Sequence, residues 1–189
     1  FMFQFLIYLL IVCPSFIHSS KKELYNLQKS AIVKLTPMNF ATQITNNRAK
    51  NIISLVHFYT PTDGKSEDIA KIITEVDKEF ESMFKLAFIN CKEYKDICEK
   101  QDVHAFPSLM IYPPLPAPVL KYEGKLTTKH IVSYLGKFVD NKATEINNNN
   151  VDSFLHDHPN LPKIILFTDK TNTPLIFKRL SVLYDKKID

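Results

Sequence analysis

The sequence of 189 residues contains no tryptophan, only three glycines and only three cysteines. The scarcity of glycine and an apolar content of 45% argue against a largely disordered chain and favour one or two packed domains. The net charge of +4 is not gathered into a basic stripe, so we do not expect nucleic acid as a partner. Cys13, Cys91 and Cys98 form no Cys-X-X-Cys motif, the arrangement that places an attacking and a resolving thiol together.

The first seventeen residues are nearly all apolar and predict a targeting segment. Residues 1–20 are expected to be a cleaved secretory signal peptide, because the run is short for a bilayer span and contains Pro14. A signal anchor is the alternative, which Lys21 and Lys22 would suit, and a buried core segment is the third reading. We expect contact with a membrane only if this segment is an uncleaved anchor. Phe1 precedes Met2, so the true start is expected upstream.

Residues 31–140 alternate between strand and helix patterns. The segment 52–59 is apolar on both faces, as a central strand covered by helices must be. After it, apolar residues with helical spacing from Ile69 to Phe80 predict a helix with one buried face. The other expected elements are strands at 32–35, 84–90, 109–112 and 119–122, and helices at 37–44, 93–101 and from Thr127 or Thr128 onward. The order βαβαβαββα predicts an α/β domain with a mixed central sheet and helices on both faces, and residues 46–51 are expected to be a polar loop.

A linker at 141–150, ending in four asparagines, separates this domain from a second βα pattern. In residues 151–189 we expect a short helix near Val151, a buried strand at 163–168 and a helix opened by Thr173 and Pro174. So short a segment cannot close a domain. The chain is therefore expected to continue beyond Asp189, or this segment to pack on the first domain.

Three motifs identify a resemblance. They are Tyr-Thr-Pro-Thr-Asp-Gly-Lys-Ser at 59–66, Phe-Pro-Ser-Leu at 106–109, and Tyr-Glu-Gly at 122–124. Together they resemble a catalytic-type module of the protein disulfide isomerase family, whose loop reads Tyr-Ala-Pro-Trp-Cys-Gly-His-Cys. The resemblance covers residues 31–140 well and implies a thioredoxin-like fold. It covers 146–189 loosely, which implies the start of a second thioredoxin-like module at 151–189.

The resemblance places Asp63 and Ser66 at the two cysteine positions and Thr62 at the tryptophan position. Thiol–disulfide exchange needs a thiolate and a resolving thiol, so we expect this module to be redox-inactive. Asp63 is expected to cap the following helix. His57 stands where the family has a buried acidic residue, and we expect a partly buried histidine with one hydrogen-bond partner.

Cys91 and Cys98 match a structural disulfide of lumenal members of the family. The resemblance therefore implies a bridge and an oxidising compartment, the endoplasmic-reticulum lumen; two buried free thiols are the alternative. Closing this small loop contributes about 2–3 kcal/mol in the chain-entropy treatment.

The resemblance also implies a cis peptide bond between Phe106 and Pro107, facing the 59–66 loop. A groove formed by Thr62, Asp63, Gly64, Phe106 and Pro107 is then expected to bind extended polypeptide by strand addition. The alternative is that this proline is retained for the fold alone.

Other kinds of site are not expected. Gly64-Lys65-Ser66 lacks the first glycine of a phosphate-binding loop, since Tyr59 stands there. His104, His130, His156 and His158 show no metal-ligand spacing. We therefore expect neither a cofactor nor a metal.

Three functions fit these observations. The first is a non-catalytic protein of the secretory pathway that binds client polypeptide, or a redox-active partner, during protein folding. The second is an inactive module of a larger disulfide isomerase whose Cys-X-X-Cys lies outside this sequence. The third is a structural subunit of a lumenal assembly.

Overall fold

The computed structural model describes residues 24–28, 30–80 and 83–187. The segment interpreted as a signal peptide or anchor, residues 1–20, lies outside them and remains a prediction. Within the described part of the chain, no helix is long and apolar enough to cross a bilayer.

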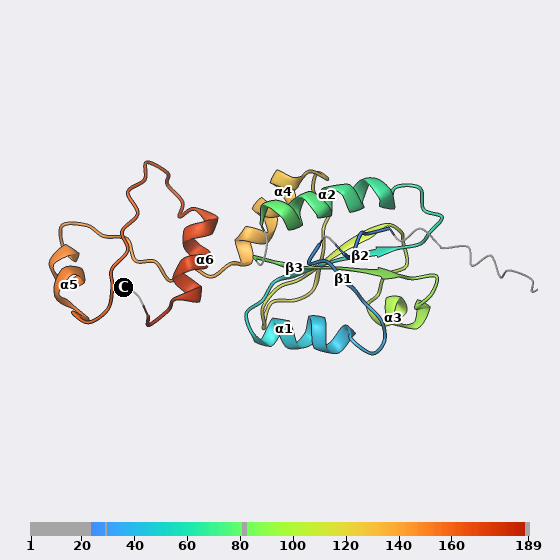
Figure 1. The fold of residues 1–189 in the computed structure, drawn as a ribbon, viewed down its shortest axis with the longest axis horizontal. Helices are drawn as coiled ribbons and strands as arrows, with labels where there is room; N and C mark the ends of the chain where they lie inside the picture. Colours follow the sequence, from blue (N-terminus) through green and yellow to red (C-terminus); the bar gives the residue numbers. More distant parts are fainter. Residues whose placement is uncertain (1–23, 29, 81–82, 188–189) are drawn as a thin grey trace, which may run out of the picture.

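A five-stranded mixed sheet forms the centre of the first domain, as expected (Figure 1). Its order is β1-β3-β2-β4-β5. β2 pairs in parallel with β3 and antiparallel with β4, and the two-residue strands β1 and β5 lie at the edges. The strands are β1 (Val33–Lys34), β2 (Ser54–Tyr59), β3 (Lys85–Asn90), β4 (Ser108–Tyr112) and β5 (Leu120–Lys121). Every residue of β2 is buried, because both of its faces are covered.

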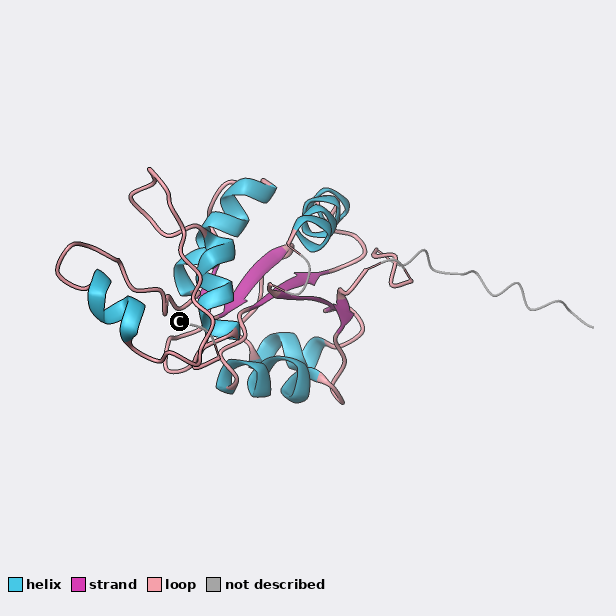
Figure 2. Cartoon of the chain, turned by 60° about the vertical axis from the view of Figure 1, so that its left-hand side comes forward, coloured by secondary structure: helices cyan, strands magenta, loops and turns pink. Residues whose placement is uncertain are grey.

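Helices cover both faces of the sheet (Figures 1 and 2). α2 (Ser66–Glu79) and α4 (Thr128–Leu135), which continues into a 3-10 turn at Gly136–Phe138, pack on one face. A π-helical turn (Ala41–Thr45), α1 (Asn46–Ala49) and α3 (Lys95–Lys100) lie on the other. The predicted buried face of α2 is confirmed by Ile69, Ile73 and Val76, which are all under 5% exposed. The thioredoxin-like α/β class expected from the sequence is therefore confirmed.

The first helical region differs from the expectation. Residues 36–39 form a turn, in which the Asn39 side chain accepts from the Thr36 N–H and donates to the Lys34 carbonyl. Regular helical structure runs from about residue 40 to Ala49, so most of the expected polar loop at 46–51 is helix. Of the polar residues predicted as a loop, Asn46 is exposed, whereas Asn47 and Arg48 are half-buried, and Ile44 before them is buried.

The proline-rich connector between β4 and β5 is held by Arg48. Its Nε donates to the Pro113 carbonyl at 2.9 Å and its Nη2 donates to the Ala117 carbonyl. The backbone N–H of Leu115 donates to the Arg48 carbonyl at 3.4 Å, so the connector is bound at three points. A second cis bond, Leu115–Pro116, lies within it.

The C-terminal segment contains two of its three expected elements, α5 (Val151–His156) and α6 (Leu175–Leu183). The expected buried strand at 163–168 is wrong: these residues form no strand, and the Phe167 side chain is 89% exposed. No described strand outside β1–β5 offers a partner there. α6 packs on the first domain through Leu175, and the Ser181 hydroxyl accepts from the Lys142 N–H at 3.0 Å.

Candidate functional site

The two segments that were expected to form a peptide groove lie at the same end of the sheet. Phe58, near the end of β2, lies opposite Ser108, the first residue of β4. The loop after β2 and the segment before β4 are therefore neighbours, and the Phe106–Pro107 bond is cis, as expected. Thr62 and Gly64 are exposed, while Asp63, Phe106 and Pro107 are half-buried.

Asp63 closes the loop before α2, but it is not the N-cap residue that the sequence predicted, since α2 begins at Ser66 and its N-cap is Lys65. Its carboxylate accepts hydrogen bonds from the backbone N–H groups of Thr60 (3.0 Å), Lys65 (3.2 Å) and Ser66 (2.9 Å). The Ser66 hydroxyl donates to the same carboxylate at 2.5 Å. Gly64 has a φ of 69°, a left-handed backbone conformation that glycine adopts without strain. This tight turn lets the Asp63 side chain face the N–H groups on both sides of it.

These bonds also set the charge of Asp63. Burial alone would raise the pKa of its carboxyl group, but the hydrogen bonds from the Ser66 side chain and from the three backbone N–H groups lower the pKa below its ordinary value. The N–H groups of Lys65 and Ser66, at the start of α2, thus already donate to an internal carboxylate. The expectation that the Gly64-Lys65-Ser66 sequence is not a nucleotide site stays a prediction.

His57 lies under the loop and is more deeply buried than expected. Its side chain is fully buried and has two partners, not one: Nδ1 lies 2.7 Å from the Tyr25 hydroxyl, and Nε2 lies 3.3 Å from the Ser66 hydroxyl. The Tyr25 ring also stacks on Phe88, with 4.4 Å between centroids. The segment preceding β1 therefore reaches the site through Tyr25, a contact that no short-range sequence pattern predicts.

The hydrogen-bond partners fix which group donates and which accepts in the bonds that join Tyr25, His57, Ser66 and Asp63. The single proton of the Ser66 hydroxyl is donated to Asp63, so His57 must donate to Ser66 from Nε2. His57 Nδ1 then accepts from the Tyr25 hydroxyl. Burial lowers the pKa of His57 to about 4, against a smaller opposing effect of the Asp63 charge, so the imidazole is neutral. Burial likewise raises the pKa of the Tyr25 hydroxyl, which keeps it a donor.

The cysteines of the described region are joined to each other beside this loop. Cys91 and Cys98 form a disulfide with a Cα–Cα distance of 5.8 Å, and both are at most 5% exposed. The Cys91 N–H donates to the Tyr59 carbonyl at 2.8 Å, so the bridge lies just behind the start of the loop. Cys13 lies outside the described residues.

The other histidines of the described region do not gather with further metal-ligating side chains. In the described region, no three His, Cys, Asp or Glu side chains gather so that they could hold a metal ion. His104 pairs with Asp102 at 3.0 Å, His130 Nδ1 lies 2.7 Å from the Thr127 hydroxyl, and His156 Nδ1 lies 2.8 Å from the Asp152 carbonyl.

Comparisons with known proteins agree with the fold. A Dictyostelium discoideum protein provisionally named a protein disulfide-isomerase is 28% identical over 165 residues, which cover 84% of this chain and 39% of that protein. Protein disulfide-isomerase MPD1 of Saccharomyces cerevisiae is 27% identical over 184 residues, covering 84% of this chain and 54% of its own length. The chain thus spans about half or less of these relatives. The crystal structure of ERdj5 form II superposes with a TM-score of 0.61 at 20% identity, over 84% of this chain and 21% of that one.

The family model for thioredoxin matches residues 31–137, the region that contains β1–β5, α1–α4 and the 59–66 loop. This region is more than half of the chain, and the chain belongs to the thioredoxin family.

Proposed function

We propose that this chain is a thioredoxin-family protein of the secretory pathway that holds polypeptide without exchanging disulfides. One observation carries the proposal. The loop at the start of α2 has a carboxylate and a hydroxyl, bonded to each other at 2.5 Å, where dithiol chemistry needs two thiols. Neither an aspartate nor a serine can attack a disulfide or resolve a mixed disulfide, because neither side chain has a thiol. The thioredoxin frame around the loop, with β2, α2 and the cis Phe106–Pro107 bond, is nevertheless intact.

The backbone beside the loop supports polypeptide binding. No hydrogen bond links the backbone N–H or carbonyl of Phe106 to another described residue. Such groups can pair with an extended chain laid between Phe106 and the exposed Thr62 and Gly64. The main-chain bonds would hold many different sequences, because they do not depend on side chains.

Two observations support the secretory pathway. A buried disulfide persists in an oxidising compartment and is rare in the cytosol. The Dictyostelium discoideum and Saccharomyces cerevisiae relatives are both named protein disulfide-isomerases. The leader interpretation of residues 1–20 is consistent with this location and stays a prediction.

The partial coverage of the relatives favours a second candidate, in which this chain is the inactive module of a larger oxidoreductase. MPD1 extends well beyond the matched region, since 54% of its length is covered. A Cys-X-X-Cys in an attached module would then act on chains held here. A fixed partner in the groove, as in a structural subunit of a lumenal assembly or in a complex with a redox-active protein, remains the third candidate.

Insulin reduction tests the absence of dithiol chemistry. We expect the full chain to reduce insulin no faster than buffer with glutathione alone. The variant Asp63→Cys/Ser66→Cys is expected to gain activity, because it restores the thiol pair on an intact frame, whereas Asp63→Cys alone is not. Wild-type activity that alkylation abolishes would contradict the proposal.

Binding of an S-alkylated, permanently unfolded polypeptide tests the groove. The substitution Thr62→Arg places a long cation in it, and we expect the Kd to rise by at least about tenfold, or roughly 1.4 kcal/mol. Thr144→Arg, the same change at an exposed threonine of the linker, is the matched control. Equal affinities of the wild type and Thr62→Arg would show that the polypeptide does not bind in this groove. Co-purification of one protein in fixed stoichiometry would favour the structural subunit instead.

A further inference from the structure

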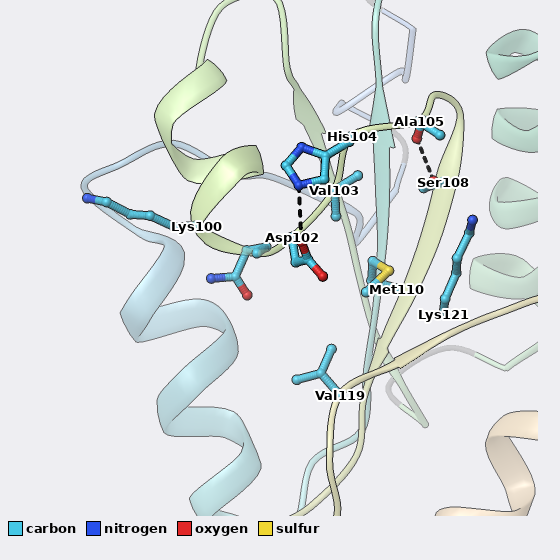
Figure 3. A pocket seen from close by; sticks show the side chains of 10 residues that line it. Lys100, Asp102, Val103, His104, Ala105, Ser108, Met110, Val119 and Lys121 are labelled. Carbon is cyan, nitrogen blue, oxygen red and sulfur yellow. Dashed lines mark hydrogen bonds and ion pairs between the residues drawn. The ribbon is translucent and has the colours of Figure 1, made fainter.

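A cavity of about 590 Å³ opens beside the segment between Ala105 and Ser108, between α3 and strands β4 and β5 (Figure 3). Ala105 and Ser108, the two residues that flank this segment, line the cavity. The Ser108 hydroxyl donates to the Ala105 carbonyl at 2.6 Å, which closes the turn between them. A chain bound at Phe106 would therefore lie beside the cavity.

The floor of the cavity is apolar. It is formed by Val103 after α3, by Met110 of β4 and by Val119 before β5. Val103 is 4% exposed, whereas Met110 and Val119 are only partly buried although they pack on the core. Met110 is a flexible side chain that adapts to different apolar partners. The floor can thus receive one large apolar side chain.

The rim of the cavity carries an excess of positive charge. Lys100 of α3 lies on one side and Lys121 of β5 on the other, as Figure 3 shows. Lys121 is the register partner of Met110, which places its side chain on the cavity's face of the sheet. The lining carboxylate, Asp102, bonds to His104 at 3.0 Å, and neither lysine forms an ion pair with a described residue.

We propose that this cavity selects clients: it takes an apolar side chain of the bound polypeptide when acidic residues flank that side chain. The inference rests on the proposed function and adds a sequence preference to it. Acidic flanks place carboxylates beside Lys100 and Lys121, while lysine flanks would face like charge. Because both lysines are exposed, the preference is expected to be modest and to weaken with salt.

Fluorescence anisotropy with matched synthetic peptides tests this preference. Three short extended peptides would share a central leucine, and its flanking residues would be glutamate, glutamine or lysine. We expect the glutamate peptide to bind the full chain roughly two- to fivefold more tightly than the glutamine peptide at about 0.05 M salt. The lysine peptide should bind most weakly, and the differences should shrink at about 0.5 M salt.

Charge reversal assigns the preference to the cavity. Lys100→Glu/Lys121→Glu should reverse the order of the glutamate and lysine peptides, whereas Lys50→Glu/Lys78→Glu, at two exposed lysines elsewhere, should keep it. Ala105→Trp fills the cavity from an exposed position and should weaken all three peptides. Circular dichroism confirms that each variant is folded.

The outcomes separate this inference from the proposed function. Equal binding of the three peptides, or an order that survives the Lys100 and Lys121 reversal, would overturn the preference. If Thr62→Arg still weakened all peptides in that case, the groove and the proposed function would stand. Failure of every peptide to bind would overturn both.

Discussion

The buried imidazole of His57 should make the stability of this protein fall with acid in a defined pH window. A base whose pKa is lower in the folded state stays neutral there, while the unfolded chain takes up a proton. The contribution of His57 is therefore complete above pH 6.5, its ordinary pKa, and is lost as the pH falls toward about 4, its pKa in the fold. Over that window the loss amounts to roughly 3 kcal/mol.

A double variant isolates this effect. Tyr25→Phe/His57→Leu replaces the hydrogen-bonded pair by apolar groups of similar size and leaves Ser66 bonded to Asp63. We expect the free energy of unfolding of the variant to be nearly flat where that of the wild type falls by up to about 1.4 kcal/mol per pH unit. His104→Gln, which removes an exposed histidine, is the control and should follow the wild type.

Urea unfolding followed by far-UV circular dichroism measures these differences, since the chain has no tryptophan to report by fluorescence. The disulfide is kept intact in every sample. Asp63, whose pKa is lowered, loses its contribution only below its ordinary value of 3.8, so it does not interfere. The free energies of unfolding of the wild type and the double variant could instead fall in parallel between pH 6.5 and pH 4. That result would refute the assignment of a neutral, buried His57.

Three further changes have defined outcomes. Cys91→Ala/Cys98→Ala opens a small loop and should lower the free energy of unfolding by about 2–3 kcal/mol in urea titrations; an unchanged midpoint would show that the bridge does not constrain the unfolded chain. Asp63→Ala removes the carboxylate that bonds the loop to the start of α2 and should cost about 1–2 kcal/mol by the same measurement, with Asp63→Asn retaining more than half of the contribution. Arg48→Ala frees the proline-rich connector and should cost about 1–3 kcal/mol, whereas the exposed Lys50→Ala should cost less than about 0.5 kcal/mol.

The central elements could be predicted because their patterns are local. The apolar run at 52–59 and the helical spacing from Ile69 to Phe80 each identify an element whose burial the structure confirms. That Asp63 bonds backbone N–H groups next to α2 also follows from local chemistry, since its partners lie within three residues, although the N-cap itself is Lys65. The cis bond before Pro107 and the disulfide were accessible only through resemblance to a known family.

Two features could not be predicted for opposite reasons. Tyr25 and His57 are 32 residues apart in the chain, and nothing near either of them indicates that the fold brings them together. The segment 163–168 has the composition of a buried strand, but composition records only a preference. Whether a strand forms depends on a neighbouring strand, and the described sheet provides none at that place.

The position of Tyr25 limits how far the N-terminal end of this protein can be shortened. Trimming that stops upstream of Tyr25 leaves its ring against Phe88 and its hydroxyl on His57. A cut just beyond Tyr25 would leave a cavity in the core and would leave His57 Nδ1 without its hydrogen-bond donor. Any cleavage that leaves this fold intact must therefore act before Tyr25, and mass spectrometry of the purified protein would locate such a cut.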